Sequence, residues 1–151
     1  MRWPPKERRD GFVQKEGPVT KERFQERFAE LQKAFSRLEE ALAVPVTDTV
    51  IMDGVIQRFE FTFELTWKTL KILLDHKGLA TVAAPRDVLQ GAFAAGIISD
   101  GEAFMQMLRD RNLTTHIYKE EMAAQIYDRI KNAHAAALRT LLGRLATEKI
   151  A

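Results

Sequence analysis

The fold of this chain is decided by residues 57–70, which read QRFEFTFELTWKTL and predict a helix with two apolar stripes. One stripe has side chains spaced three or four residues apart, namely Phe59, Phe63, Trp67, Leu70 and Leu74. The other stripe lies on a different side of the same helix and consists of Phe61, Leu65 and Ile72. Because packing against a single core requires only one apolar stripe, two stripes indicate a helix that is buried on both sides.

Two arrangements would bury both sides of this helix. In the first, the helix faces its own core on one side and a second copy of the chain on the other, because exposed aromatic surface of this extent favours association. In the second, the helix is wholly internal in a monomer. We predict the homodimer and keep the internal helix as the alternative.

Polar and glycine residues mark the two ends of this helix. Thr47 or Asp48 can cap its start. It then runs to His76 or Lys77, because Gly78 suits the left-handed residue that follows a helix. The sequence therefore predicts one long helix between these positions.

Helices are also predicted on both sides of it. Before it, a helix runs from a cap at Thr20 to near Pro45, because apolar residues recur at spacings of four and three. These residues are Phe24, Phe28, Leu31, Phe35, Leu38 and Leu42. After it, Pro85 opens a short helix that stops at Gly96.

Two more helices complete the prediction. Ser99 and Glu102 form a capping box for a fourth helix, and a final amphipathic helix begins near Lys119. No strand candidate of comparable quality occurs. The predicted fold class is therefore all-α, an antiparallel up-and-down bundle of four to five helices.

Residues 1–19 differ in composition from the rest of the chain. They hold five basic and three acidic side chains, whereas the remaining residues hold 18 of each. They also contain the helix breakers Pro4, Pro5, Gly11, Gly17 and Pro18. We predict a flexible basic N-terminal arm at residues 1–19 and a helical bundle domain at residues 20–151. The arm either contacts phosphates or an acidic partner, or is a solvated tail.

The composition of the 151 residues excludes several classes of protein. There is no cysteine, so disulfides, thiolate metal sites and cysteine nucleophiles are excluded. No apolar run approaches the ~20 residues that span a bilayer, and the N-terminus lacks a signal-peptide core. Neither His76 nor His134 has a second ligand at metal-binding spacing. We expect a cytoplasmic protein with no membrane contact, no metal and no cofactor.

The segment from Arg111 to Tyr118, which reads RNLTTHIY, carries the candidate chemistry. Arg111 and His116 would point about 140° apart on a continuous helix, but the two threonines between them favour a helix end or bend. A bend would let the two side chains converge. Arg111 suits a phosphate, His116 can transfer a proton near neutral pH, and Asn112 and Tyr118 can orient them or bind substrate.

These are the groups needed to cleave RNA without a metal. A general base activates the ribose 2′-hydroxyl against the adjacent phosphodiester, while a cation stabilises the charge that grows on the phosphoryl oxygens. An arginine and a histidine at a helix junction can also have a purely structural role. The arginine then places a positive charge at the C-terminal end of a helix, and the histidine caps that end. Glu64 and Lys68 are interpreted as a structural ion pair, or as part of a cleft if they are buried.

The chain resembles the nucleotidyltransferase substrate-binding protein family in the order and spacing of four segments. These segments are residues 57–70, Pro85-Arg86, Ala92-Phe93 with Gly96-Ile-Ile, and Arg111 to Tyr118. That family belongs to the HEPN superfamily and is related to the HepT toxins. The resemblance covers approximately residues 24 to 145. It implies a homodimeric helical bundle with two Arg-x4-His-x-Tyr motifs facing a shared cleft. It also implies a separate minimal nucleotidyltransferase as partner, which neutralises a ribonuclease in the toxin branch.

The resemblance assigns a role to each residue of the segment. Arg111 and His116 match the family's proposed catalytic pair, and Asn112 matches the polar residue that follows the arginine. Tyr118 matches the tyrosine that the partner adenylylates in the HepT branch, where AMP would block phosphate binding sterically and by its charge. Lys119 departs from the expected asparagine or aspartate.

Three functions remain open on this basis. The first is a metal-independent endoribonuclease toxin, acting on RNA and neutralised by the nucleotidyltransferase. The second is a non-catalytic subunit that binds a nucleotide or other substrate for that enzyme, and the third is a helical adaptor. No Gly-Ser pair followed by Asp-x-Asp occurs, so the chain is not itself the transferase.

Overall fold

A computed structural model describes the backbone of residues 5–79, 83–116 and 119–148, with side chains from Thr20 onward. No strand occurs in these ranges, and the predicted all-α bundle is confirmed. The elements in chain order are α1 (Pro5–Leu42), α2 (Thr49–His76), α3 (Pro85–Ala94), α4 (Gly101–Leu113), the 3₁₀ turn η1 (Thr114–His116), α5 (Glu120–Arg129), the π-helical turn η2 (Ile130–His134) and α6 (Ala135–Leu145).

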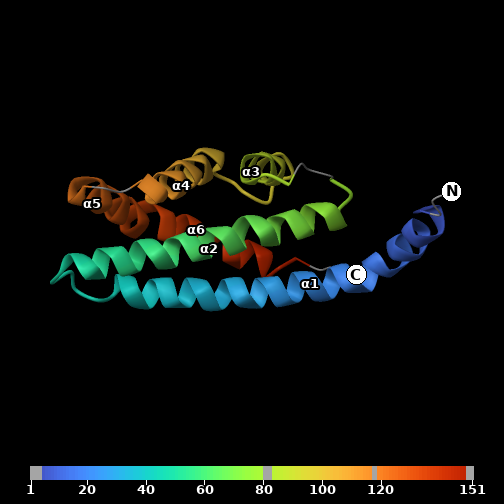
Figure 1. The fold of residues 1–151 in the computed structure, drawn as a ribbon, viewed down its shortest axis with the longest axis horizontal. Helices are drawn as coiled ribbons and strands as arrows, with labels where there is room; N and C mark the ends of the chain where they lie inside the picture. Colours follow the sequence, from blue (N-terminus) through green and yellow to red (C-terminus); the bar gives the residue numbers. More distant parts are fainter. Residues whose placement is uncertain (1–4, 80–82, 117–118, 149–151) are drawn as a thin grey trace.

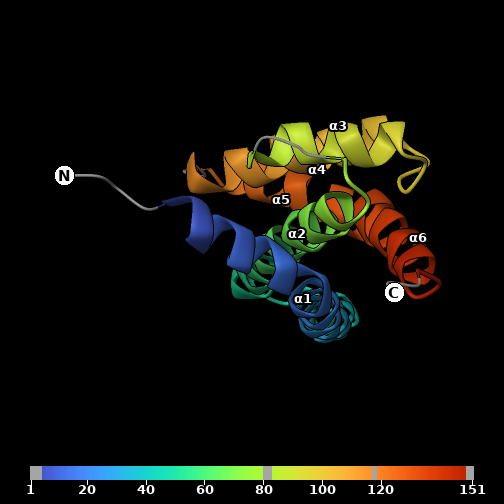
Figure 2. The same cartoon turned by 90° about the vertical axis from the view of Figure 1, so that its right-hand side faces the viewer.

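The helix that decides the fold lies at the centre of the molecule. α1 and α2 run antiparallel and side by side (Figure 1). Seen end on, α2 lies between α1 on one side and the pair α3 and α4 on the other (Figure 2). α2 also packs against α5. α1, α3, α4 and α5 therefore all pack on α2, whereas α6 contacts α1 and η2.

The two apolar stripes of α2 differ in how completely they are buried. The first stripe is buried apart from Trp67, which is partly buried, and Leu65 and Ile72 of the second stripe are buried as well. Phe61, the remaining member of the second stripe, is 63% exposed. Packing within one chain therefore accounts for most of the doubled apolar surface, and the homodimer stays a prediction that concerns Phe61.

Three threonines are also buried in α2. Thr62, Thr66 and Thr69 each donate a hydroxyl hydrogen bond to the carbonyl oxygen four residues earlier, at 2.6–2.8 Å. Because a buried hydroxyl without a partner destabilises a fold, these local bonds allow polar residues inside an apolar helix.

The predicted ends of α2 and α3 are confirmed. Asp48 caps α2 by accepting the Val50 N–H at 3.1 Å, and Pro85 opens α3. Gly78 and Gly96 follow these helices with φ of 75° and 77°, a region that side chains with a Cβ rarely enter.

The predicted capping box is wrong by one residue. Asp100, not Ser99, caps α4 and accepts the Ala103 N–H at 3.1 Å. Aspartate is at least as good a cap as serine, and the helix begins at Gly101. Glu102 therefore lies in the first turn and accepts a hydrogen bond from Arg109 at 2.6 Å instead of reaching back.

The start of α1 also differs from the prediction. α1 begins at Pro5, whereas the breakers in residues 1–19 predict no regular structure there; residues 1–4 lie outside the described residues. Proline is well suited to a first helical turn, and an established helix extends at little cost per residue. The first turns bend away from the bundle in Figure 1, as expected for a helix that contains Pro18. The flexibility of the arm and the domain boundary at residue 20 stay predictions.

The last predicted helix is divided in two. It starts at Glu120, close to the predicted position, but the π-helical turn η2 separates α5 from α6. The apolar face of this helical segment is buried at Ile126, Ile130, Leu141 and Leu145. Among the described residues, no helix is both long and apolar enough to cross a membrane.

Candidate functional site

Arg111 lies in the last turn of α4 and forms an ion pair with Glu64 of α2. The side chains of Arg111 and Glu64 are 33% and 29% exposed. The same Glu64 carboxylate accepts the Trp67 Nε1–H at 3.2 Å and lies 4.0 Å from Lys68 Nζ. The predicted pairing of Glu64 with Lys68 is therefore present but weak. The stronger partner, Arg111, is 47 residues away in the sequence, so helical spacing could not reveal it.

A shallow hollow of about 260 Å³ lies beside this ion pair. It is lined by Gln57, Glu60, Phe61, Glu64 and Arg111. The exposed Phe61 ring and the Arg111 guanidinium thus share one small surface depression between α2 and α4. The arrangement offers a cation, two carboxylates and an aromatic ring to a ligand.

His116 lies at the end of the turn that follows Arg111. α4 ends at Leu113 and the chain tightens into η1, as the two threonines predict. Thr114 Oγ1 donates to the Arg111 carbonyl oxygen at 2.6 Å, and Thr115 Oγ1 donates to that of Asn112 at 3.1 Å. These bonds satisfy carbonyl groups that the end of the helix leaves open.

Asn112 and His116 are both exposed. Over the residues that the structure describes, no hydrogen bond joins the side chains of Arg111, Asn112 and His116 to one another, so their convergence on one substrate stays a prediction. Tyr118 lies outside the described residues.

A buried charge network lies directly beside Arg111, at Asp110. This carboxylate is fully buried and accepts two parallel hydrogen bonds from Arg129, each of 2.8 Å. It also accepts a bond from Gln106 at 3.2 Å and lies 2.7 Å from His134 Nε2. His134 lies 24 residues after Asp110 in the sequence, so no local pattern indicates this pairing.

The position of His134 depends on η2. His134 is the last residue of this π-helical turn, is 2% exposed, and stacks on the Phe59 ring with 5.3 Å between ring centroids. An ionised carboxylate only accepts hydrogen bonds, so His134 donates its Nε2–H to Asp110. π-helical turns are found frequently at functional sites. This turn is therefore a signal of function, and it is visible only in the structure.

The network controls the ionisation of Asp110. Burial disfavours the charged carboxylate, but the hydrogen bonds from His134 and Arg129 outweigh burial and lower the pKa of Asp110 from 3.8 to about 2. The hydrogen bond to Asp110 in turn raises the pKa of Arg129. Asp110 is therefore charged at neutral pH and has its partners in place.

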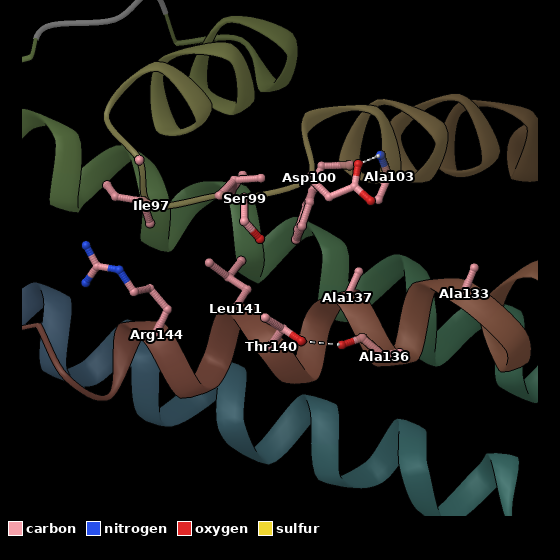
Figure 3. A pocket seen from close by; sticks show the side chains of 13 residues that line it. Ile97, Ser99, Asp100, Ala103, Ala133, Ala136, Ala137, Thr140, Leu141 and Arg144 are labelled. Carbon is pink, nitrogen blue, oxygen red and sulfur yellow. Dashed lines mark hydrogen bonds between the residues drawn. The ribbon is translucent and has the colours of Figure 1, made fainter.

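A larger groove of about 450 Å³ lies elsewhere, between the connection that follows α3 and the surface of η2 and α6. Figure 3 shows Ile97 and Ser99 on one side and Ala137, Leu141 and Arg144 on the other. The charged groups at its rim are already engaged, because Asp100 caps α4 and Arg144 pairs with Glu148 at 2.7 Å. The groove is mainly apolar and offers no group suited to proton or phosphate chemistry.

The candidate site thus combines an arginine at the end of α4 with an exposed histidine at the end of η1, within an all-helical bundle. A family model described as nucleotidyltransferase substrate binding protein like matches residues 26–147. The chain belongs to this family. In the described residues, no group of three or more histidine, aspartate or glutamate side chains could hold a metal ion.

Known proteins are similar to this chain in sequence and in fold. A Haemophilus influenzae protein named "Probable ribonuclease HepT" is 35% identical over 89 residues, which cover 56% of this chain and 60% of that relative. The match thus spans less than two thirds of the relative's length. A crystal structure of a Thermus thermophilus protein is 34% identical with a TM-score of 0.70, and the match covers 76% of this chain and 98% of that one.

A third similarity concerns the fold alone. The tri-AMPylated Shewanella oneidensis HEPN toxin, in complex with the MNT antitoxin, is 15% identical with a TM-score of 0.70. The match covers 83% of this chain and 97% of the toxin.

Proposed function

We propose that this chain is the HEPN-type partner of a minimal nucleotidyltransferase and that it acts as a metal-independent endoribonuclease, neutralised by that partner. The observation that carries the proposal is the half-buried Arg111 guanidinium, followed by the exposed His116 imidazole at the end of the next turn. The similarity to a relative named as a ribonuclease supports the activity. The likeness in fold to a toxin bound to its antitoxin supports the kind of partner.

The chemistry follows from what each group can do. His116 takes the proton of a ribose 2′-hydroxyl, and the 2′-oxygen then attacks the adjacent phosphorus. The bond from phosphorus to the 5′-oxygen breaks, the 5′-oxygen takes a proton from water, and a 2′,3′-cyclic phosphate remains. Arg111 stabilises the negative charge that grows on the phosphoryl oxygens, for which its fork of N–H donors is well suited. DNA lacks the 2′-hydroxyl and is not a substrate.

The test is cleavage of single-stranded RNA by the purified chain in EDTA. We expect RNA to be cut and DNA of the same sequence to stay intact, and His116→Ala to remove cleavage while the helical circular dichroism is unchanged. His76→Ala is the matched control, because His76 is also partly exposed at a helix end but lies about three turns beyond Glu64. Cleavage that survives in His116→Ala would disprove the proposal.

A homodimer is part of the proposal, with the second copy packing on Phe61 at the edge of the hollow and leaving Arg111 open to RNA. An aromatic ring that is 63% exposed next to a candidate site is typical of an interface. Phe61→Ser should therefore shift the mass measured by light scattering from dimer to monomer. Phe93→Ser is the control, since Phe93 is 52% exposed on α3. A dimer that persists in Phe61→Ser would place the interface elsewhere.

Adenylylation of Tyr118 by the partner is the proposed means of neutralisation, because a bulky anion added to the segment from Arg111 to Tyr118 would repel an RNA phosphate. Incubation with the partner and ATP should add AMP to the wild-type chain, with release of pyrophosphate, and not to Tyr118→Phe. Tyr127 is the only other tyrosine and is buried, so Tyr127→Phe should be modified normally. Modification of Tyr118→Phe would move the acceptor to another residue.

The second candidate function is a non-catalytic nucleotide-binding subunit of the same two-component enzyme. The description of the family model favours it. Under this function the chain would bind a nucleotide through Arg111, cleave no RNA, and keep its affinity in His116→Ala. The cleavage assay therefore distinguishes the two candidates.

A further inference from the structure

The buried network around Asp110 closes a loop in the chain that contains the candidate site. Asp110 lies in the last turn of α4, and its partners Arg129 and His134 lie 19 and 24 residues later. The segment between these anchors begins with Arg111 and includes His116. The two ends of the site segment are thus joined by hydrogen bonds inside the protein.

This junction has no spare hydrogen-bonding capacity. Oδ1 of Asp110 accepts from Gln106 and Arg129, and Oδ2 accepts from Arg129 and His134. A carboxylate has about four acceptor positions, and all of them are used. Two parallel bonds from one guanidinium also fix orientation as well as distance. The junction therefore defines one geometry.

The last turn of α4 is held from two directions. Asp110 joins it to α5 and η2, while the next residue, Arg111, joins it to Glu64 of α2. The hydroxyl of Thr114 bonds back to Arg111 and continues this support into η1, where His116 lies. A displacement at Asp110 would consequently move both Arg111 and His116.

We propose that Asp110, Arg129 and His134 are positioning residues for the ribonuclease site, an inference that rests on the function proposed above. They hold the end of α4 at a fixed separation from the end of α5 and η2, so that Arg111 and His116 approach a phosphodiester in one arrangement. None of the three touches the substrate. Small displacements of catalytic groups can lower a rate about a hundredfold, so a distant clamp of this kind affects turnover strongly.

The decisive pair of variants is His134→Phe and His134→Gln. Phenylalanine keeps a ring that can stack on Phe59 but removes the donor to Asp110, whereas glutamine keeps an N–H donor. We expect His134→Phe to lower kcat for RNA about a hundredfold with little change in KM, and His134→Gln to restore most of the rate. Asp128→Asn is the control, because Asp128 is an exposed acid beside Arg129.

Two readouts do not depend on cleavage. Amide hydrogen exchange over residues 111–116 should be faster in His134→Phe than in wild type and normal in His134→Gln. The NMR resonances of the His116 imidazole should shift or broaden in His134→Phe and match wild type in His134→Gln. If wild-type protein cleaves no RNA, the proposed function fails, while these two measurements still decide whether the network positions the segment.

The inference would be overturned if a folded His134→Phe variant kept the wild-type kcat. It would also be overturned if amide exchange and the His116 resonances were unchanged in this variant. The network would then only stabilise the fold. Should His134→Phe not fold, Arg129→Lys replaces it. Lysine keeps the charge but cannot form the two parallel bonds to Asp110, so the same loss of kcat and the same faster exchange are expected.

Discussion

Asp110 and Arg111 are neighbours in the sequence and carry opposite charges, yet their surroundings differ in almost every respect. Asp110 is fully buried and all of its acceptor positions are used within the chain. Arg111 is one third exposed, and a single side chain, Glu64, pairs with it among the described residues. One helical turn thus presents an internal charge on one side and an available charge on the other.

The difference shows how a structural charge can be told from a functional one. A charge whose hydrogen bonds are all made inside the protein stabilises or positions the fold, because it has nothing left to offer a ligand. A guanidinium has five N–H donors, and the described side chains engage Arg111 through Glu64 alone, so donors are left for a ligand. Variants of either residue, or of the groups that contact it, test this distinction.

The largest effect is expected from Asp110→Ala. Removing the carboxylate leaves Arg129 and His134 without their buried partner, which should lower the free energy of unfolding by about 3–5 kcal/mol. Urea denaturation measures this loss, and Asp128→Ala should change stability by less than about 0.5 kcal/mol. A small loss in Asp110→Ala would mean that the buried network is dispensable for folding.

The next effect concerns Arg111→Lys. We expect cleavage of RNA to fall roughly a hundredfold, because lysine cannot form two parallel bonds to a phosphate, while stability changes by about 1 kcal/mol or less. Steady-state kinetics and thermal melting measure the two quantities. Arg109→Lys is the control, since Arg109 is an exposed arginine on the same helix. A variant that melts early but still cleaves would reverse the roles assigned to these neighbours.

Acid should weaken the buried network of Asp110. The folded protein lowers the pKa of Asp110 from 3.8 to about 2, so its contribution to stability is complete above pH 3.8 and is lost as the pH falls through 2. The shift corresponds to about 2 kcal/mol. The difference in unfolding free energy between wild type and Asp110→Asn should therefore shrink between pH 5 and pH 2. A constant difference over this range would contradict the lowered pKa.

The smallest effect is expected from Glu64→Gln. The glutamate carboxylate competes with a phosphate for Arg111, so its neutralisation should lower KM for RNA by roughly fivefold, as expected for about 1 kcal/mol in a surface environment. Glu60→Gln is the matched control, because Glu60 lines the same hollow and pairs with no described side chain. A higher KM in Glu64→Gln would show that Glu64 orients Arg111 instead of competing for it.

The sequence predicted the parts of this molecule that depend on local spacing. The central helix, its Asp48 cap and the end of α4 at the two threonines all follow from residues close to one another. The cap of α4 was misplaced, at Ser99 instead of Asp100, because two good capping residues stand side by side. The start of α1 was misplaced because helix extension from Thr20 outweighed the glycines and Pro18.

The site was only half visible in the sequence. The local motif indicated Arg111 and His116, and the resemblance gave them roles, but the partners Glu64, Arg129 and His134 lie 47, 19 and 24 residues away from the charges they meet. Such pairs are created by packing and leave no periodic signal. His134 is the clearest case, because its position depends on a π-helical turn that no pattern of apolar residues predicts.

The π-helical turn also bears on which changes of chain length the bundle can accept. A turn closed by i to i+5 bonds takes in about one residue more than an α-helical turn, so the chain holds a surplus residue between α5 and α6. Losing one of the exposed residues Lys131 to Ala133 would return this turn to α-helix and leave the apolar face of α6 in register. A deletion within α5 or α6 would instead rotate that face by about 100°. Homologous chains of slightly different length should therefore vary at this turn.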